Sequence, residues 1–416
     1  VVDALPLHIL GKRRHCERRL EFRRMRRAVL GLHQCVDQFL RVGRPVGVKL
    51  DIDPQLLAKL LDLAAQRAVA CMAIADQDAA ITIVGTIGAT NILKAITVDA
   101  SAGNDNTFTG AVKATTFTMT GNGATDDVIF NGTANAFNLV ITADGRATFG
   151  ADDVMTGNIT TTADGKGTLV FGTATASKSL VTGNIGSSNT LDLEAITVVT
   201  ASSFTTTLAT GNVFALAVGA SGAGTMALGG TWEGTAITVG SGTTLTPAAN
   251  AAGALTGNVL AASDGVGTVT FAATTTDTTV VTGNLGAVGG SDDMLAANFA
   301  PATGKTATVT GTVSVTTITH SGAGTVAIGG DVLGITNLSA NGFLNLADNH
   351  TGVIANTSGV AGTGTVDFAA GIGASAAVGT GTLAAINFAG ASAQAGAVTA
   401  TQINVNGAAA ITFAAD

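Results

Sequence analysis

The feature that most constrains the fold is an internal repeat of 100 residues. The segment VMTGNITTTADGKGTLVFGTATASKSLVTGNIG, starting at Val154, aligns without gaps with ALTGNVLAASDGVGTVTFAATTTDTTVVTGNLG, starting at Ala254. SGAGTMALGG at Ser221 and SGAGTVAIGG at Ser321 repeat at the same offset. Tandem self-similarity of this kind is the signature of stacked repeat architectures. We therefore divide residues 79–416 into units at about 79–153, 154–253, 254–350 and 351–416.

Smaller steps lie within each unit. T-G-N or T-G-T triplets start at positions 156, 182 and 210 and again at 256, 282 and 310, so they recur at the same two spacings in both units. Between them run short alternating segments rich in Thr and Val, whose β-branched side chains suit a pleated strand. Gly-Asn, Asp-Gly and Ser-Gly pairs supply turns between the strands. The sequence therefore predicts an all-β fold for residues 79–416.

Two all-β architectures fit short strands at regular spacing. A right-handed parallel β-solenoid, or β-helix, fits the tandem repeat and the small core residues, and coils of about 25 residues would give about 13 coils and a rod of about 60 Å. A string of immunoglobulin-like sandwiches fits the unit length. The sandwich expects a recurring core Trp, but the one Trp, Trp232, is replaced by Val332 at the equivalent position. We predict the solenoid.

Residues 1–78 differ in composition from the rest. They hold 14 of the 20 Lys and Arg and all three Cys, and their net charge is +5, against −13 for residues 79–416. An apolar stripe beside an Arg-rich face predicts a helix near residues 17–40, and Asp53-Pro54 predicts the start of a second helix over 53–70. Three interpretations stay open for this short basic helical segment. It could come from a wrongly assigned gene start or reading frame, because the chain starts with Val. It could be a helical region with a solvated face or an export-related leader, or it could be an anion-binding surface.

No catalytic motif is visible in residues 79–416. The two histidines, His320 and His350, do not recur at the 100-residue offset, nor do the basic residues Arg146, Lys166 and Lys178. Lone histidines of this kind are typical of surface or satisfied core positions. We therefore predict that the chain is not an enzyme, that it has no catalytic or cofactor-binding residues, and that residues 79–416 bind no nucleic acid.

Calcium is the one metal that the sequence suggests. NGATDDVIFNG, which contains Asp126 and Asp127, and GGSDDML, which contains Asp292 and Asp293, resemble the Gly-Asp repeats that bind calcium in some secreted proteins. Carboxylates beside glycine turns can offer oxygen ligands. The copies here are isolated rather than consecutive, so exposed turn residues are the competing interpretation.

The Thr-rich texture raises one further alternative. Regular threonine arrays on solenoid faces can order water and bind ice, but they require one T-x-T per coil. The Thr positions drift along this sequence, which argues against ice binding.

The motifs T-G-N-[IVL]-G and A-D-G-x-G-T-[LV]-x-F resemble the passenger regions of bacterial autotransporter surface antigens, with the rickettsial outer-membrane surface antigens nearest in texture. A surface-layer (S-layer) protein with calcium-assisted assembly is a related possibility. The resemblance covers about 79–416 and implies a secreted, extracellular adhesin or surface coat. Its partners would be host, matrix or neighbouring-cell surface molecules, or copies of itself, and it would attach to the outer membrane only through a barrel that this chain does not contain. A carbohydrate-active or tail-spike β-helix protein is the alternative, which three or more acidic residues on one face would favour.

Overall fold

The computed structural model describes residues 71–74, 80–89, 91–99, 105–121, 127–188, 190–249, 254–272, 274–287, 289, 292–406 and 410–413. These residues form 33 strands and no helix. The helices predicted near 17–40 and over 53–70 lie outside the described residues. The first strand, Cys71–Ile74, lies within residues 1–78, the segment predicted to be helical. It belongs to the solenoid, because Met72 and Ile74 are buried in the core.

The strands of the first half are β1 (Cys71–Ile74), β2 (Ile81–Ile83), β3 (Leu93–Val98), β4 (Asn106–Phe108), β5 (Lys113–Met119), β6 (Asp127–Phe130), β7 (Asn135–Ile141), β8 (Arg146–Phe149), β9 (Met155–Thr156), β10 (Ile159–Thr161), β11 (Thr168–Phe171), β12 (Lys178–Val181), β13 (Leu193–Thr200), β14 (Thr205–Ala209), β15 (Val213–Gly222), β16 (Thr225–Ala227), β17 (Trp232–Val239) and β18 (Thr244–Thr246). Those of the second half are β19 (Leu255–Ala261), β20 (Val266–Phe271), β21 (Thr278–Thr282), β22 (Met294–Phe299), β23 (Thr306–Val309), β24 (Val313–His320), β25 (Thr325–Ile328), β26 (Val332–Leu338), β27 (Phe343–Leu346), β28 (Ile354–Asn356), β29 (Thr365–Phe368), β30 (Val378–Phe388), β31 (Ser392–Gln394), β32 (Val398–Val405) and β33 (Ile411–Phe413).

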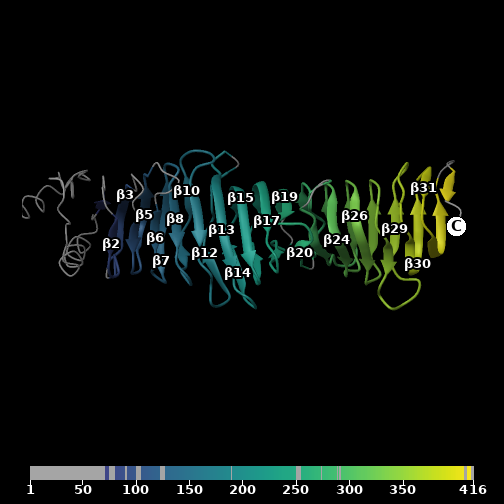
Figure 1. Ribbon diagram of the computed structural model, residues 1–416, viewed down its shortest axis with the longest axis horizontal. Coiled ribbons are helices and arrows are strands. Elements are labelled where there is room, and N and C mark those ends of the chain that lie inside the picture. Colours follow the sequence, from purple (N-terminus) through teal and green to yellow (C-terminus); the bar gives the residue numbers. More distant parts are fainter. Residues whose placement is uncertain are drawn as a thin grey trace, which may run out of the picture.

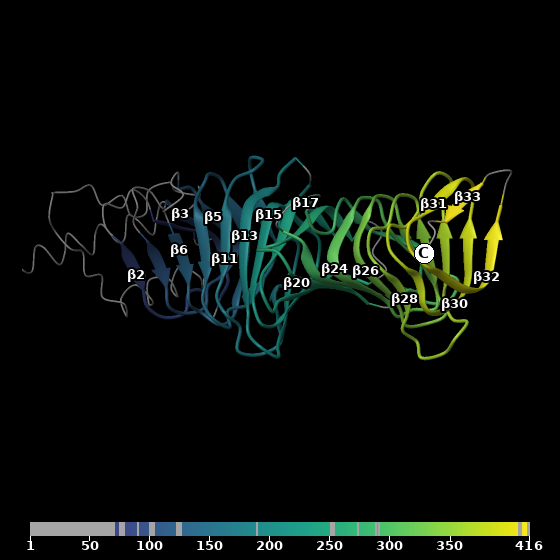
Figure 2. The same ribbon diagram turned by 45° about the vertical axis from the view of Figure 1, so that its right-hand side comes forward.

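The strands wind into a parallel β-solenoid. Most strands pair in parallel with the strand two places before and two places after them, so each coil hydrogen-bonds to its two neighbours. The coils follow one another in sequence order along an elongated rod (Figures 1 and 2). This confirms the predicted parallel β-solenoid over tandem sandwiches, whereas the right-handed winding stays a prediction.

One column of paired residues runs through the whole described rod. It passes through Met72, Ile96, Phe117, Leu139, Ile159, Ile185, Val213, Trp232, Leu255, Val281, Val309, Ile328, Leu346, Phe368, Phe388 and Val405. Its successive steps make about 15 coils, slightly more than the sequence predicts. At about 4.8 Å per coil the rod is about 70 Å long.

The coils are unequal in length. Pairing leads from Ile159 of the first full unit to Ile185, Val213 and Trp232. It leads from Val259, the sequence equivalent of Ile159, to the equivalent positions Leu285, Val313 and Val332. The next step differs, because Trp232 pairs with Leu255 whereas Val332 pairs with His350, which is nearer in the sequence. Each 100-residue unit therefore spans about four coils, and the corner loops absorb the differences in length.

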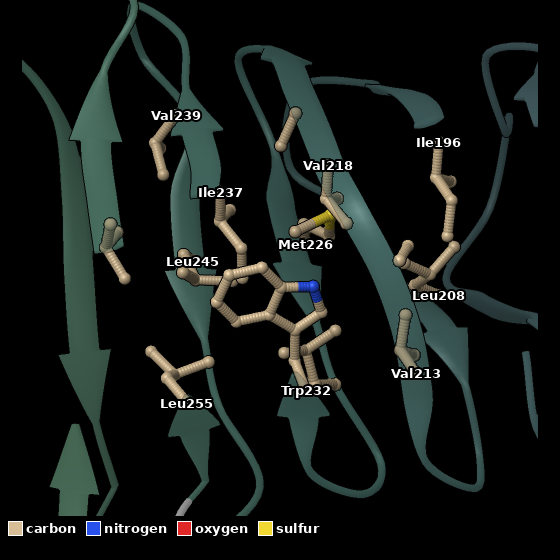
Figure 3. Close-up of a cluster of buried hydrophobic side chains, with 14 of the residues drawn as sticks. Ile196, Leu208, Val213, Val218, Met226, Trp232, Ile237, Val239, Leu245 and Leu255 are labelled. Carbon is tan, nitrogen blue, oxygen red and sulfur yellow. The ribbon is translucent and has the colours of Figure 1, made fainter. Parts of the chain in front are cut away.

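Inward-facing residues alternate along the strands and form one continuous core. Phe108, Phe130, Phe149 and Phe171 stack in one column, with ring centroids 5.0–5.6 Å apart. Offset stacking of this kind stabilises beyond the burial of apolar area. Trp232 is fully buried among aliphatic side chains of neighbouring coils (Figure 3), so it is a core residue despite its lack of a repeat partner.

Candidate functional site

The glycines of the T-G-N triplets lie where successive coils approach each other closely. A Cβ atom on Gly283 would lie 2.3 Å from the carbonyl oxygen of Gly257 in the coil before, so only glycine fits. The asparagine that follows is a hydrogen-bond acceptor for the next coil. Asn158 Oδ1 accepts the backbone N–H of Asn184 at 2.9 Å, and Asn184 Oδ1 accepts that of Asn212 at 2.8 Å.

This asparagine ladder was not predicted from the sequence. It runs from Asn138 to Asn212 and ends on the N–H of Thr231, and a second, shorter ladder joins Asn258, Asn284 and Thr312. We interpreted the Gly-Asn pairs only as turns, although the recurrence of Asn in successive triplets was the available signal. The ladder is structural: it supplies acceptors to corner N–H groups that the sheets do not pair.

Of the first pair of predicted calcium ligands, Asp126 and Asp127, the structure describes only Asp127. Asp126 lies outside the described residues. The Asp127 carboxylate accepts two hydrogen bonds from the Arg146 guanidinium of the next coil, one of them at 2.6 Å. A bidentate pair of this kind occupies both carboxylate oxygens.

The second pair lies beside the Asp264-Gly265 turn. The N–H of Gly265 donates to the carbonyl oxygen of Asp293 at 2.8 Å, and the Ser314 hydroxyl donates to the Asp293 carboxylate. Within the described ranges, no three His, Cys, Asp or Glu side chains are grouped so that they could hold a metal ion. Calcium binding stays a prediction.

Three acidic residues of the first full unit interact through their charges. Asp192 is buried, its Oδ1 atom has no hydrogen-bond partner, and its backbone N–H donates to Asp164 Oδ1 at 3.1 Å. Burial, followed by the negative charges of Asp164 and Glu233, raises the pKa of Asp192 to about 6. Two carboxyl groups held in different environments are the arrangement that acid–base catalysis by carboxylic acids uses.

Asp153 is a second buried carboxyl. It accepts hydrogen bonds from the Asn135 amide at 2.8 and 3.0 Å. Burial nevertheless raises its pKa to about 7, which outweighs the opposing effect of these hydrogen bonds.

The two histidines are core residues. His320 lies in the column after Phe299, and neither of its ring nitrogens has a hydrogen-bond partner. His350 Nε2 lies 2.9 Å from the Thr336 hydroxyl. Burial lowers the pKa of each imidazole to about 4, so both are neutral near pH 7.

The basic residues of the first half link adjacent coils. Lys166 Nζ lies 2.8 Å from Asp144, Lys178 Nζ lies 2.5 Å from Asp152, and Arg146 pairs with Asp127. Each pair joins one coil to the coil before it, so these cations act as inter-coil contacts.

Outward-facing threonines of one face are aligned in register. Thr205, Thr225, Thr244 and Thr268 occupy successive paired positions, although they are unevenly spaced in the sequence. Loops of different length bring these threonines into register, but the T-x-T pattern does not occur in every coil, because Ala227 lies between Thr207 and Thr246 in the neighbouring column.

Comparisons with known proteins give no relative: no family model, no curated protein and no solved structure matches the chain. In the part of the chain that the structure describes, no helix has the length and apolarity needed to cross a membrane.

Proposed function

We propose that this chain is an extracellular, surface-displayed structural or adhesive protein, similar to an autotransporter passenger or surface coat, and that it is not an enzyme. The observation that carries the proposal is the uninterrupted stack of about 15 coils. A rod of this kind holds contact surfaces away from the surface to which it is attached, and many copies can bind by avidity.

The electrostatics agree with this role. Residues 79–416 carry a net charge of −13, which favours solubility and disfavours binding to nucleic acid. The partners in this proposal are host, matrix or neighbouring-cell surface molecules, or further copies of the chain. Adhesion would use the outward faces, whose side chains are mostly small and polar.

The test is brief protease treatment of intact cells that produce the protein, followed by blotting for the region 79–416. We expect this signal to disappear while a cytoplasmic control protein survives. Protection of the signal in intact cells, with digestion after lysis, would exclude surface display.

A second candidate, a carbohydrate-active β-helix protein, is favoured by the cluster of Asp164, Asp192 and Glu233. The raised pKa of Asp192 suits a general acid, and Asp164, whose charge acts on Asp192, is the candidate second carboxyl group. The test is release of reducing ends from a panel of polysaccharides. Activity that Asp192→Asn abolishes would support this candidate, and Asp292→Asn, at the equivalent position of the next unit, is the matched control. No release from any polysaccharide would argue against it.

A further inference from the structure

The end of the rod that β32 and β33 form, which we call the tail, leaves part of the hydrophobic core uncovered (Figure 2). β32 continues the inward columns of β30, because Ile403 pairs with Ile386 and Val405 pairs with Phe388. Ile386 and Phe388 are fully buried, whereas Ile403 and Val405 are 44% and 48% exposed. Val405 is the one exposed member of the column that starts at Met72, so a core position faces solvent at the tail.

The uncovered surface includes both tail strands. Phe413 of β33 is 47% exposed, and its ring centroid lies 6.5 Å from that of Phe388. Val398, Ala400 and Ile411 pack against the core and are only partly buried. We call six apolar residues together the tail face: Val398, Ala400, Ile403, Val405, Ile411 and Phe413.

The backbone of β32 offers an unpaired edge beside these side chains. Among the described strands, β32 pairs only with β30. The N–H of Asn406 donates to the Phe388 carbonyl oxygen at 2.9 Å, and successive residues of a strand direct their N–H groups to opposite sides. The N–H groups of Ile403 and Val405 therefore point away from β30. A strand of eight residues with free donors and acceptors is a template for another strand.

The tail also carries no charge. Residues 368–415 contain no Asp, Glu, Lys, Arg or His, although residues 79–416 as a whole have a net charge of −13. Proteins usually protect an exposed sheet edge with charged side chains or Pro, and β32 contains neither. The tail therefore lacks the repulsion that would keep two copies of this acidic chain apart.

The opposite end of the described rod, which we call the head, differs. Met72, Ile74 and Ile83, the inward residues of β1 and β2, are only 7–8% exposed. The exposed apolar residues nearby, Val84 and Ile92, lie outside the strands. The head therefore offers no uncovered row of core residues to the tail of another copy.

We propose that the tail face binds the tail face of a second copy of this chain. A two-fold axis brings the same strand of both copies together, so β32 of one copy lies antiparallel to β32 of the other. This pairing supplies partners to the free edge of each β32 and covers the apolar residues of each tail with those of the other. A two-fold contact places identical surfaces against each other, and an uncharged surface permits this without repulsion between like charges.

This inference does not depend on the proposed surface display. The test measures the mass of the purified full chain by analytical ultracentrifugation over a range of concentrations, with a reductant because the chain has three Cys. We expect a concentration-dependent dimer and no larger species, because a two-fold contact is complete with two copies. A monomer at every concentration would overturn the proposal. An open series of larger species would overturn the tail-to-tail arrangement.

A pair of charged substitutions locates the contact. Ile403→Lys with Val405→Lys places like charges on both sides of it, and we expect the dissociation constant of the dimer to rise more than about 100-fold. The matched control is Ile335→Lys with Phe343→Lys, because these side chains are 44% and 46% exposed but lie on β26 and β27, away from the tail. We expect this control to keep the dimer, and equal loss in both pairs would overturn the assignment to the tail face.

A second variant tests the strand edge without adding charge. Val405→Pro removes an N–H that points away from β30, so it preserves the pairing within the rod while it blocks the free edge. We expect the dimer to be lost while circular dichroism shows an intact solenoid. A dimer that persists in both folded tail variants would mean that the rods associate through another face, and would overturn the proposal.

Discussion

The two full units, 154–253 and 254–350, share motifs yet occupy the rod differently. Pairing from Ile159 leads after four coils to Leu255, but Val259, the sequence equivalent of Ile159, lies in the column of Leu169. The second unit is therefore shifted by one strand column relative to the first. Equivalent residues face different directions, and each face of the rod combines residues that are not equivalent in sequence.

Three positions separate the units most clearly. Trp232, Ala220 and Asn212 of the first unit correspond to Val332, His320 and Thr312 of the second. Each exchange changes a different interaction: core volume, a buried titratable group, or a step of the asparagine ladder. Substitutions that place a residue of one unit in the other can therefore separate the stability that the shared motifs provide from the stability that depends on these three positions.

Removal of Trp232 should have the largest effect. Its side chain is fully buried, and Gly234 and Gly257 pack so closely that a Cβ on either would lie within 2.8 Å of the indole ring. We expect Trp232→Ala to destabilise the surrounding coils by about 3–5 kcal/mol, because it leaves a large cavity. Hydrogen exchange of β15, β17 and β19 measures this loss.

Val332→Ala is the matched control for Trp232. We expect a smaller increase in exchange, confined to β24, β26 and the coil that follows, because solenoid coils interact mainly with their neighbours. If both variants accelerated exchange equally along the whole rod, the rod would be unfolding as a single cooperative unit and the comparison would fail.

A fall in pH should change the stability of two sets of coils in opposite directions: those that contain His320 and His350, and those that contain Asp153 and Asp192. Unfolded histidine titrates near 6.5, whereas His320 and His350 titrate at about 4 when folded, so between these values the unfolded state binds more protons. Their coils should lose stability as the pH falls from 6.5 to 4, by roughly 3 kcal/mol for each histidine. His320→Phe, which continues the column from Phe299, should reduce this dependence.

The coils around Asp153 and Asp192 should show the reverse. Their pKa values are raised to about 7 and about 6 from an ordinary value of 3.8, so the folded state binds more protons in that range. Their stabilising effect is present below pH 3.8 and is lost as the pH rises through the folded pKa values. Site-resolved hydrogen exchange in mildly acidic and in neutral buffer tests both regions, and the same direction of change in both would contradict the assignment.

Asn212→Thr should have a smaller effect. The substitution introduces the residue found at 312 and removes the acceptor for the Thr231 N–H. We expect a loss of about 1 kcal/mol, the usual net contribution of one hydrogen bond. The reverse change, Thr312→Asn, removes no such acceptor. Faster exchange of the Thr231 amide in Asn212→Thr is the expected signature, and an unchanged amide would show that the ladder contributes little.

The all-β solenoid could be predicted because its rules are local. Alternating Thr and Val specify strands, and T-G-N recurs because the close approach of coils requires glycine at positions such as Gly283. The longer coils of each unit could be predicted directly from the spacing of these triplets. The short step from Val213 to Trp232 carries no such triplet, so the rod has more coils than the triplets alone predict.

The surfaces could not be predicted because they depend on register across unequal coils. Thr244 and Thr268 lie side by side although neither is equivalent to the other in the 100-residue repeat. Asp164 and Glu233 both act on Asp192 from distant parts of the sequence. Arg146, which does not recur at the 100-residue offset, is paired with Asp127 because adjacent coils bring the two side chains together.

The Lys178–Asp152 pair offers the smallest and most local test of the comparison. Hydrogen bonds from Lys178, followed by those from Thr175, lower the pKa of Asp152 to about 2. Lys178→Thr introduces the residue found at 278 in the second unit and should move the Asp152 pKa back towards its ordinary value, which a carbon-detected NMR titration measures. Because the pair is partly exposed, added salt should reduce the difference between wild type and variant. If the variant left the Asp152 pKa unchanged, the hydrogen bonds from Thr175 alone would account for its lowered value. The ion pair would then not be what distinguishes this corner from the equivalent corner of the second unit.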